Sequence, residues 1–147
     1  MYSRRLIALF IVLFNSGSDA RDEPILKHEF ILPPDYRGAF KVVQDKKTGE
    51  VIAPIGGVIK VSVPASGIVV LKSTESLEKW HKAIAVYKGG TALPFGIGVL
   101  PNKESVAFFN LWTEADGTIY YFIGTKAQFD KVQKSTPWKV DEYLPKK

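Results

Sequence analysis

Residues Phe30 to Gly67, FILPPDYRGAFKVVQDKKTGEVIAPIGGVIKVSVPASG, decide the fold class of this chain. Short runs rich in Val, Ile and Phe are separated there by turn residues, above all Pro33-Pro34 and Pro64 to Gly67. In one run Phe40 and Val42 fall on the same face. Such alternation is typical of β-strands, and proline ends a strand because it cannot donate to the ladder. The stretch therefore predicts strands joined by tight turns.

The expected strands lie both within this stretch and on its C-terminal side. Asp45 to Gly49 has the length and the final glycine of a hairpin loop, and Asp116-Gly117 is the turn signal of a second hairpin. The expected strands are Phe30 to Leu32 (beginning as early as Ile25), Ala39 to Val43, Glu50 to Ala53, Val58 to Val63, Ile68 to Leu71, a segment ending at Tyr87, Val106 to Thr113 and Thr118 to Gly124.

Helical signals are few. Thr125 is placed to cap a short helix from Lys126 to Gln133. Ser73 to Gly90 is ambiguous, and we expect a helical turn near Ser76 to His81 followed by a strand. Leu93 to Leu100 is apolar but interrupted by proline and glycine, which suits a loop or a bent edge strand. We predict an all-β fold: an antiparallel β-sandwich of about seven strands with one short C-terminal helix.

The N-terminus has the order of a secretory signal peptide. Arg4-Arg5 precedes the nine apolar residues Leu6 to Phe14, and Asn15 to Ala20 is short and polar. We expect cleavage after Ala20, with Gly17 or Ser18 as alternative sites. Nine residues span roughly 14 Å as a helix, too little for a membrane core of ~30 Å. The arginine pair leaves a twin-arginine route open beside the general secretory route. The mature protein is expected to be periplasmic or extracellular, with no transmembrane segment.

These signals divide the chain into four parts. The expected parts are a signal peptide (1–20), a flexible lead-in (21–29), the β-sandwich domain (30–134) and a C-terminal tail (135–147). Trp138, Val140, Tyr143 and Leu144 are apolar residues that could pack this tail onto the domain.

Composition excludes several classes of function. The net charge is +5 at pH 7, but the lysines are scattered, whereas nucleic-acid binding calls for a concentrated basic face. The chain has no cysteine, which excludes disulfides, thiol catalysis and thiolate metal sites. His28 and His81 form no local motif with each other. We therefore expect no nucleic-acid partner, no metal and no cofactor.

Motifs for catalysis are also missing. Ser66 lies in the turn Pro64 to Gly67, without the strand-to-helix elbow of a nucleophilic serine. Glu114 and Asp116 flank a hairpin tip, where carboxylates are solvated and serve a charged turn. We assign no catalytic residue and predict that the protein is not an enzyme.

Aromatic residues are the more suggestive class. Trp80 and Trp138 are candidates for a ligand platform, because exposed indole rings stack on sugars and small ligands. Trp112 lies in the apolar run FFNLW and is expected to pack in the core.

Three motifs carry a resemblance to a known family. They are Ile31-Leu32-Pro33 with Tyr36 to Phe40, Gly56-Gly57 leading into Val63 to Ile68, and Tyr121 to Lys126 with Phe129. The chain resembles a family of uncharacterised bacterial secreted proteins and lipoproteins, although it lacks an anchoring cysteine. The resemblance implies an exported protein of undefined activity. Its opening also looks like small β-sandwich modules of the transthyretin type, an analogy of fold alone.

We therefore predict a non-enzymatic envelope or secreted module. The alternative is a protein that binds a small ligand or carbohydrate through exposed aromatics, and a hydrolase comes third. A protein or carbohydrate at the cell envelope is the expected kind of partner.

Overall fold

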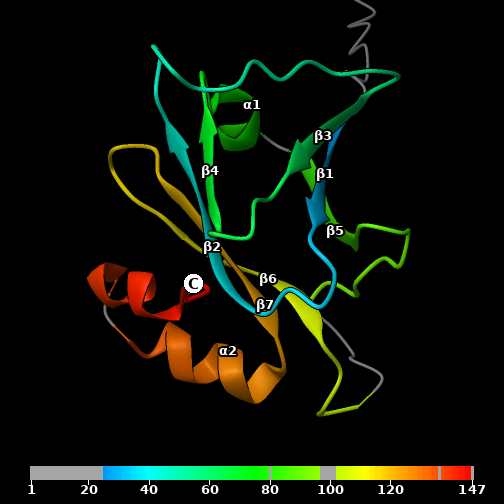
Figure 1. Ribbon diagram of the computed structural model, residues 1–147, viewed down its shortest axis with the longest axis vertical. Helices are drawn as coiled ribbons and strands as arrows, with labels where there is room; N and C mark the ends of the chain where they lie inside the picture. Colours follow the sequence, from blue (N-terminus) through cyan, green and yellow to red (C-terminus); the bar gives the residue numbers. More distant parts are fainter. Residues whose placement is uncertain (1–24, 80, 97–101, 136, 147) are drawn as a thin grey trace, which may run out of the picture.

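The computed structural model describes residues 25–79, 81–96, 102–135 and 137–146 (Figure 1). These residues are mostly β-structure, with seven strands in two sheets. In chain order the elements are β1 (Leu26–Leu32), β2 (Gly38–Gln44), β3 (Val58–Ser62), β4 (Ile68–Leu71), α1 (Glu75–Glu78), β5 (His81–Tyr87), β6 (Ala107–Thr113), β7 (Ile119–Gly124), α2 (Lys126–Gln133) and the 3-10 helix η1 (Pro137–Tyr143).

The first sheet, called the parallel sheet below, has the strand order β3-β1-β5. Both of its pairings are parallel, and Phe30 of β1 lies opposite Val61 on one side and Ala85 on the other. The second, called the mixed sheet, has the order β4-β2-β7-β6. In the mixed sheet β2 pairs in parallel with β4, while β7 is antiparallel to both of its neighbours.

The predicted antiparallel arrangement is therefore wrong for three of the five strand pairings. Side-chain alternation predicts which face of a strand is buried, but it does not specify the partner strand or its direction. Here consecutive strands β1 and β2 lie in different sheets, so the tight turns carry the chain from one sheet to the other. Parallel strands need long crossover connections, and here the chain between two strands that pair in parallel passes through the other sheet.

The hairpin predicted around Asp45 to Gly49 is also wrong. The turn itself forms, and the Asp45 carboxylate accepts hydrogen bonds from the main-chain N–H groups of Lys47 and Thr48. However, Glu50 then pairs with Leu71 of β4 and does not return along β2. Both edges of β2 are already occupied, by β4 and β7, so no place is left for a third strand there.

One apolar core lies between the two sheets. Phe30 of the parallel sheet contacts three rings of the mixed sheet, with centroid distances of 5.3 Å to Phe40, 5.8 Å to Phe108 and 4.8 Å to Tyr121. All four side chains are buried. Residues from both sheets thus form a single cluster, as in two sheets packed face to face.

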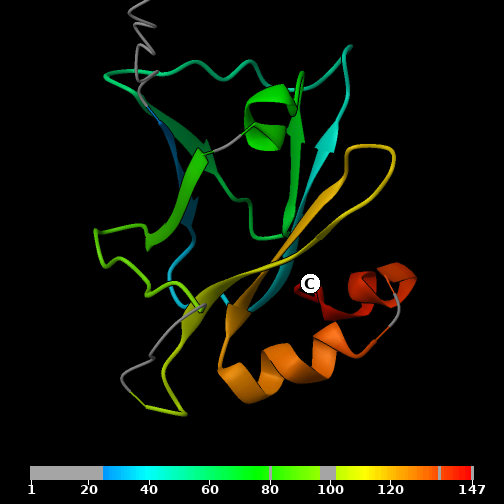
Figure 2. The same ribbon diagram turned by 180° about the vertical axis from the view of Figure 1, so that it is seen from behind.

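The opposite face of the mixed sheet is covered by α2 and η1, which lie on the same side of it in both views (Figures 1 and 2). The predicted helix and its cap are confirmed, since the Thr125 side chain accepts from the Gln128 N–H and the Gln128 side chain accepts from the Thr125 N–H. Val140 is buried in this second cluster. Tyr143 and Leu144 pack against it, as the sequence indicated for the tail.

Two boundaries differ from the expectation in ways that bear on function. Strand β1 begins at Leu26, so His28 lies inside the strand and is fully buried, whereas the sequence placed it in a flexible lead-in. The predicted helical turn near Ser76 to His81 is the shorter helix α1, and His81 opens β5. The predicted signal peptide lies outside the described residues.

Candidate functional site

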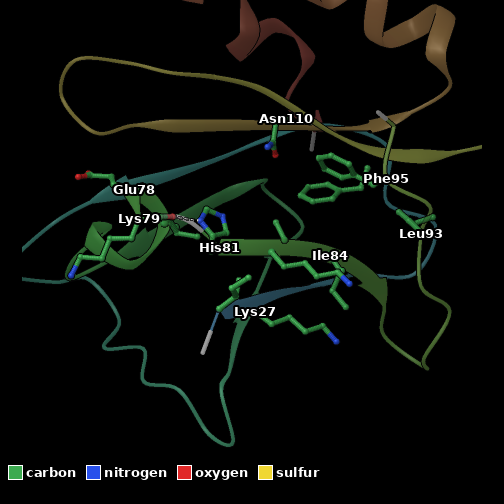
Figure 3. Close-up of a pocket in the computed structure, with 13 residues that line it drawn as sticks. Lys27, Glu78, Lys79, His81, Ile84, Leu93, Phe95 and Asn110 are labelled. Carbon is green, nitrogen blue, oxygen red and sulfur yellow. Dashed lines mark hydrogen bonds between the residues drawn. The ribbon is translucent and has the colours of Figure 1, made fainter. Parts of the chain in front are cut away.

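A groove opens between the edge of the parallel sheet at β5 and the edge of the mixed sheet at β6 (Figure 3). Its volume is about 920 Å³, within the range of roughly 300–1,000 Å³ found for ligand sites. We call it the β5–β6 groove. Its lining residues are Ile25, Lys27, Leu77, Glu78, Lys79, His81, Lys82, Ala83, Ile84, Leu93, Phe95, Phe108 and Asn110.

The segment Thr91 to Gly96, called the crossover segment below, builds one end of the groove. Its first half pairs with β5, because the Tyr87 N–H donates to the Thr91 carbonyl and the Leu93 N–H donates to the Ala85 carbonyl, both at 2.9 Å. The segment then reaches the other sheet, where its second half pairs with Phe108 of β6. It therefore joins the two sheet edges at one end, and the groove is the part of the gap that it leaves open.

The second half of the crossover segment pairs with β6 through two main-chain hydrogen bonds. The Phe108 N–H donates to the Pro94 carbonyl at 2.9 Å, and the Gly96 N–H donates to the Phe108 carbonyl at 2.8 Å. A Cβ at Gly96 would lie 2.0 Å from the Phe109 ring, closer than any side chain tolerates. Glycine is thus required where the crossover segment meets β6.

Apolar side chains form the floor of the groove. Phe95 of the crossover segment is 39% exposed, and its ring centroid lies 5.7 Å from that of the buried Phe108. Leu93 of the same segment also lines the groove, while Asn110 points from β6 toward the gap. A half-exposed phenyl ring over an apolar floor is a surface that gains free energy when a ligand covers it.

The charges around the groove are mainly positive. Three lysines line it, against the single carboxylate of Glu78. Lys27 lies 4.0 Å from Glu29, and Lys79 lies 2.8 Å from Glu75 in an exposed i,i+4 pair. Lys82 is the third, and it lies beside Lys27 across the β1–β5 pairing. An apolar groove with this rim suits an apolar ligand that carries negative charge.

Two histidines lie next to the groove. The rings of His28 and His81 meet edge to face with centroids 4.5 Å apart, although the residues are far apart in sequence. The Nε2 atom of His28 hydrogen-bonds with Ser76 Oγ at 3.1 Å, and the Nδ1–H of His81 donates to the Lys79 carbonyl at 2.7 Å. Burial, and secondly the charge of His81, lower the pKa of His28 from 6.5 to about 4. His28 is therefore neutral at physiological pH.

Chemically, the His28–Ser76 pair is a poor catalytic dyad. The Nδ1 atom of His28 is buried, and no described residue hydrogen-bonds with it, so the carboxylate that orients a catalytic histidine is missing among the described residues. The low pKa also makes the ring a weak base. Over the described residues, no three His, Asp or Glu side chains gather as a metal site would require.

The predicted aromatic platform stays a prediction. Trp80 lies outside the described residues, and Trp138 lies in η1 but its side chain is outside what the structure describes. Trp112 is half-buried and packs against the second cluster, with its ring centroid 6.1 Å from that of Tyr120, which agrees with the expected core role.

Sequence reasoning missed the β5–β6 groove. Its lining comes from five separate segments and mixes apolar with charged residues, so no local pattern groups them together. One signal was available: Leu93 and Phe95 are apolar residues in a stretch that proline and glycine mark as a loop. An apolar loop side chain is either packed on the domain or presented to a ligand, and Phe95 does both.

Comparisons with known proteins leave the family open. No family model matches the chain, and no curated protein matches it. Among solved structures it is similar to a "Putative Lipoprotein from Bacillus anthracis", with a TM-score of 0.43, 14% identity, and coverage of 82% of this chain and 97% of that chain. A likeness at this level carries no argument about function, and the resemblance read from the motifs stays a prediction. No described helix is long and apolar enough to cross a membrane.

Proposed function

We propose that this chain is an exported, non-enzymatic binding module and that the β5–β6 groove is its binding site. The observation that carries the proposal is an apolar groove of about 920 Å³ between two sheet edges, with the half-exposed Phe95 on its floor. Binding sites are typically concave, mostly apolar and edged by a few polar groups. Three lysines at the rim add a preference for negative charge.

The two further parts of the proposal rest on different observations. Export rests on the N-terminal order of Arg4-Arg5, the apolar run Leu6 to Phe14 and the polar stretch to Ala20. The non-enzymatic role is supported by the His28–Ser76 pair, which lacks an orienting carboxylate among the described residues and has a weakly basic ring.

A fluorescent dye tests the binding site. We expect the anionic apolar dye 1-anilinonaphthalene-8-sulfonate to bind the folded protein, and Phe95→Ala to weaken binding at least about fivefold through lost apolar contact. Ile55→Ala is the matched control, because Ile55 is 85% exposed and does not line the groove. The dye titration is read by fluorescence, with near-ultraviolet circular dichroism to show that each variant is folded. Equal losses in both variants, or no binding, would contradict the proposal.

Export has its own test. A tagged copy of the full chain is expected in the periplasmic or culture fraction, shortened at its N-terminus to begin near Arg21. Full-length chain retained in the cytoplasm contradicts export and leaves the groove proposal standing. Binding to an oligosaccharide array that survives Phe95→Ala would instead favour the platform of Trp80 and Trp138.

A further inference from the structure

Half of the outer edge of β5 is unpaired among the described residues. Its inner edge pairs with β1 along the whole strand, from His81 to Tyr87. On the outer edge, the main-chain groups of Ala85 and Tyr87 bond to the crossover segment. Main-chain groups alternate between the two sides of a strand, so those of His81 and Ala83 point outward as well. No described residue pairs with them, and both residues line the β5–β6 groove.

The chain itself shows what this edge accepts. Thr91 to Leu93 lies antiparallel along the outer edge at Ala85 to Tyr87 as a short added strand. Leu93, opposite Ala85, faces the core between the sheets. Beyond Ala85, the outer edge of β5 continues as far as His81 without a partner among the described residues. Unpaired strand edges are templates for pairing with another extended segment.

We propose that the β5–β6 groove binds an extended peptide segment that adds antiparallel to the free edge of β5, with apolar side chains inward and acidic side chains outward. This rests on the proposed function, because it names the ligand class of the same groove. The added strand pairs with the main chain of His81 and Ala83, which provides register and orientation.

The two faces of β5 specify which side chains of the added strand are apolar and which are acidic. Ala83 and Ala85 face the mixed sheet, and both are small, so inward side chains of the added strand have room to contact Phe95 and Phe108. Lys82 faces the other way and lies beside Lys27 of β1. Residues directly opposite each other in neighbouring strands share a face, and opposite charges stabilise such a pair. Outward side chains of the ligand are therefore acidic.

A small anionic amphiphile would use only part of this site. It could cover Phe95 and approach Lys82, but it would leave the outward main-chain groups of His81 and Ala83 without a partner. Strand β3 forms the other edge of the parallel sheet, but no residue of β3 lines the groove. The unpaired edge of β5, the apolar groove beside it and the neighbouring side chains of Lys27 and Lys82 together favour a peptide as the ligand.

Synthetic peptides test the proposal by titration calorimetry on the purified protein. We expect a peptide of about seven residues alternating valine and glutamate to bind at least about tenfold more tightly than its valine and lysine counterpart. In an antiparallel strand with valine inward, the valine N–H groups point to β5, as the N–H of Leu93 does. Methylating the valine nitrogens should weaken binding at least about tenfold, and methylating the glutamate nitrogens should not.

Two variants report on the charge. Lys82→Gln is expected to weaken binding of the acidic peptide about two- to fivefold. The matched control is Lys60→Gln, on β3 at the far edge of the same sheet. The proposal is overturned if Lys82→Gln and Lys60→Gln change the affinity for the acidic peptide equally. It is also overturned if the two methylated peptides bind with equal affinity.

Amide hydrogen exchange locates the added strand. On saturation with the acidic peptide, the amides of His81 and Ala83 should exchange more slowly, whereas those of Lys82 and Ile84, which point to β1, should not change. Protection at β3 would overturn the proposal. If the dye binds and no peptide does, strand addition is wrong and the binding module stands. If neither binds, the proposed function fails as well.

Discussion

His28 lies in the middle of the parallel sheet, fully buried, with its ring against that of His81. Its neighbours in sequence are charged, and that charge led to its placement in a flexible lead-in. The short polar partner Ser76 is 48 residues away in the chain and could not be inferred from local pattern. A polar residue in a core depends on tertiary partners, so its burial is the kind of feature that sequence alone conceals.

Burial of His28 predicts a loss of stability in mild acid. The unfolded chain takes up a proton near pH 6.5, but the folded chain does so only near pH 4. Between these values the unfolded state binds more protons, so the free energy of unfolding falls as the pH falls through this window. The limit is about 3 kcal/mol for this shift. We expect His28→Phe to reduce the loss between pH 7 and pH 4.5, measured by urea unfolding, by about 2 kcal/mol.

Nuclear magnetic resonance of the ring protons gives an independent reading. The His28 signals should titrate near pH 4, and His81→Gln should raise that pKa because the charge of His81 is the second cause of its lowering. Titration of His28 near pH 6.5, with no change in the variant, contradicts the account.

At the scale of elements, local signals were reliable and distant pairings were not. The hairpin of β6 and β7 was predicted from Asp116-Gly117, and α2 was predicted from Thr125, because the residues that specify both lie next to each other in the chain. The pairing of β1 with β5 joins segments more than fifty residues apart. The apolar run Phe30 to Leu32 predicted a strand there, but a local run carries no information on which strand lies beside it.

The cap of α2 predicts a measurable contribution. Thr125→Ala removes the acceptor of the Gln128 N–H and should lower the free energy of unfolding by about 1 kcal/mol. Thr125→Ser keeps the hydroxyl and should stay within a few tenths of a kcal/mol of the parent in urea unfolding. A serine variant as unstable as the alanine variant would show that packing of the Thr125 methyl group matters more than the cap.

At the scale of the whole molecule, two sheets share one core, and a groove opens between their edge strands β5 and β6. Phe30 is the ring of the parallel sheet that contacts three aromatic rings of the mixed sheet. The β5–β6 groove arises where the crossover segment joins β5 to β6 at one end only. No single stretch contains it, which is why the sequence predicted a layered β fold and a candidate platform at Trp80 and Trp138, but not this groove.

The shared core predicts a large cost for truncating its central ring. Phe30→Ala should lower the free energy of unfolding by about 3–5 kcal/mol, because it removes buried surface and leaves a cavity between the sheets. Ile68→Ala, at a partly exposed position on β4, should cost under about 1 kcal/mol. Chemical denaturation of both variants measures the difference, and similar costs at the two sites would contradict the position of Phe30 at the centre.

The β5–β6 groove is the proposed binding site of this protein. Its most direct test is an amide-resolved nuclear magnetic resonance titration of the isotopically labelled protein with 1-anilinonaphthalene-8-sulfonate. We expect the largest chemical-shift changes at the groove, at the amides of Ala83, Phe95 and Asn110. Shift changes that gather at β3 or α2, or that spread evenly over the molecule, would contradict it.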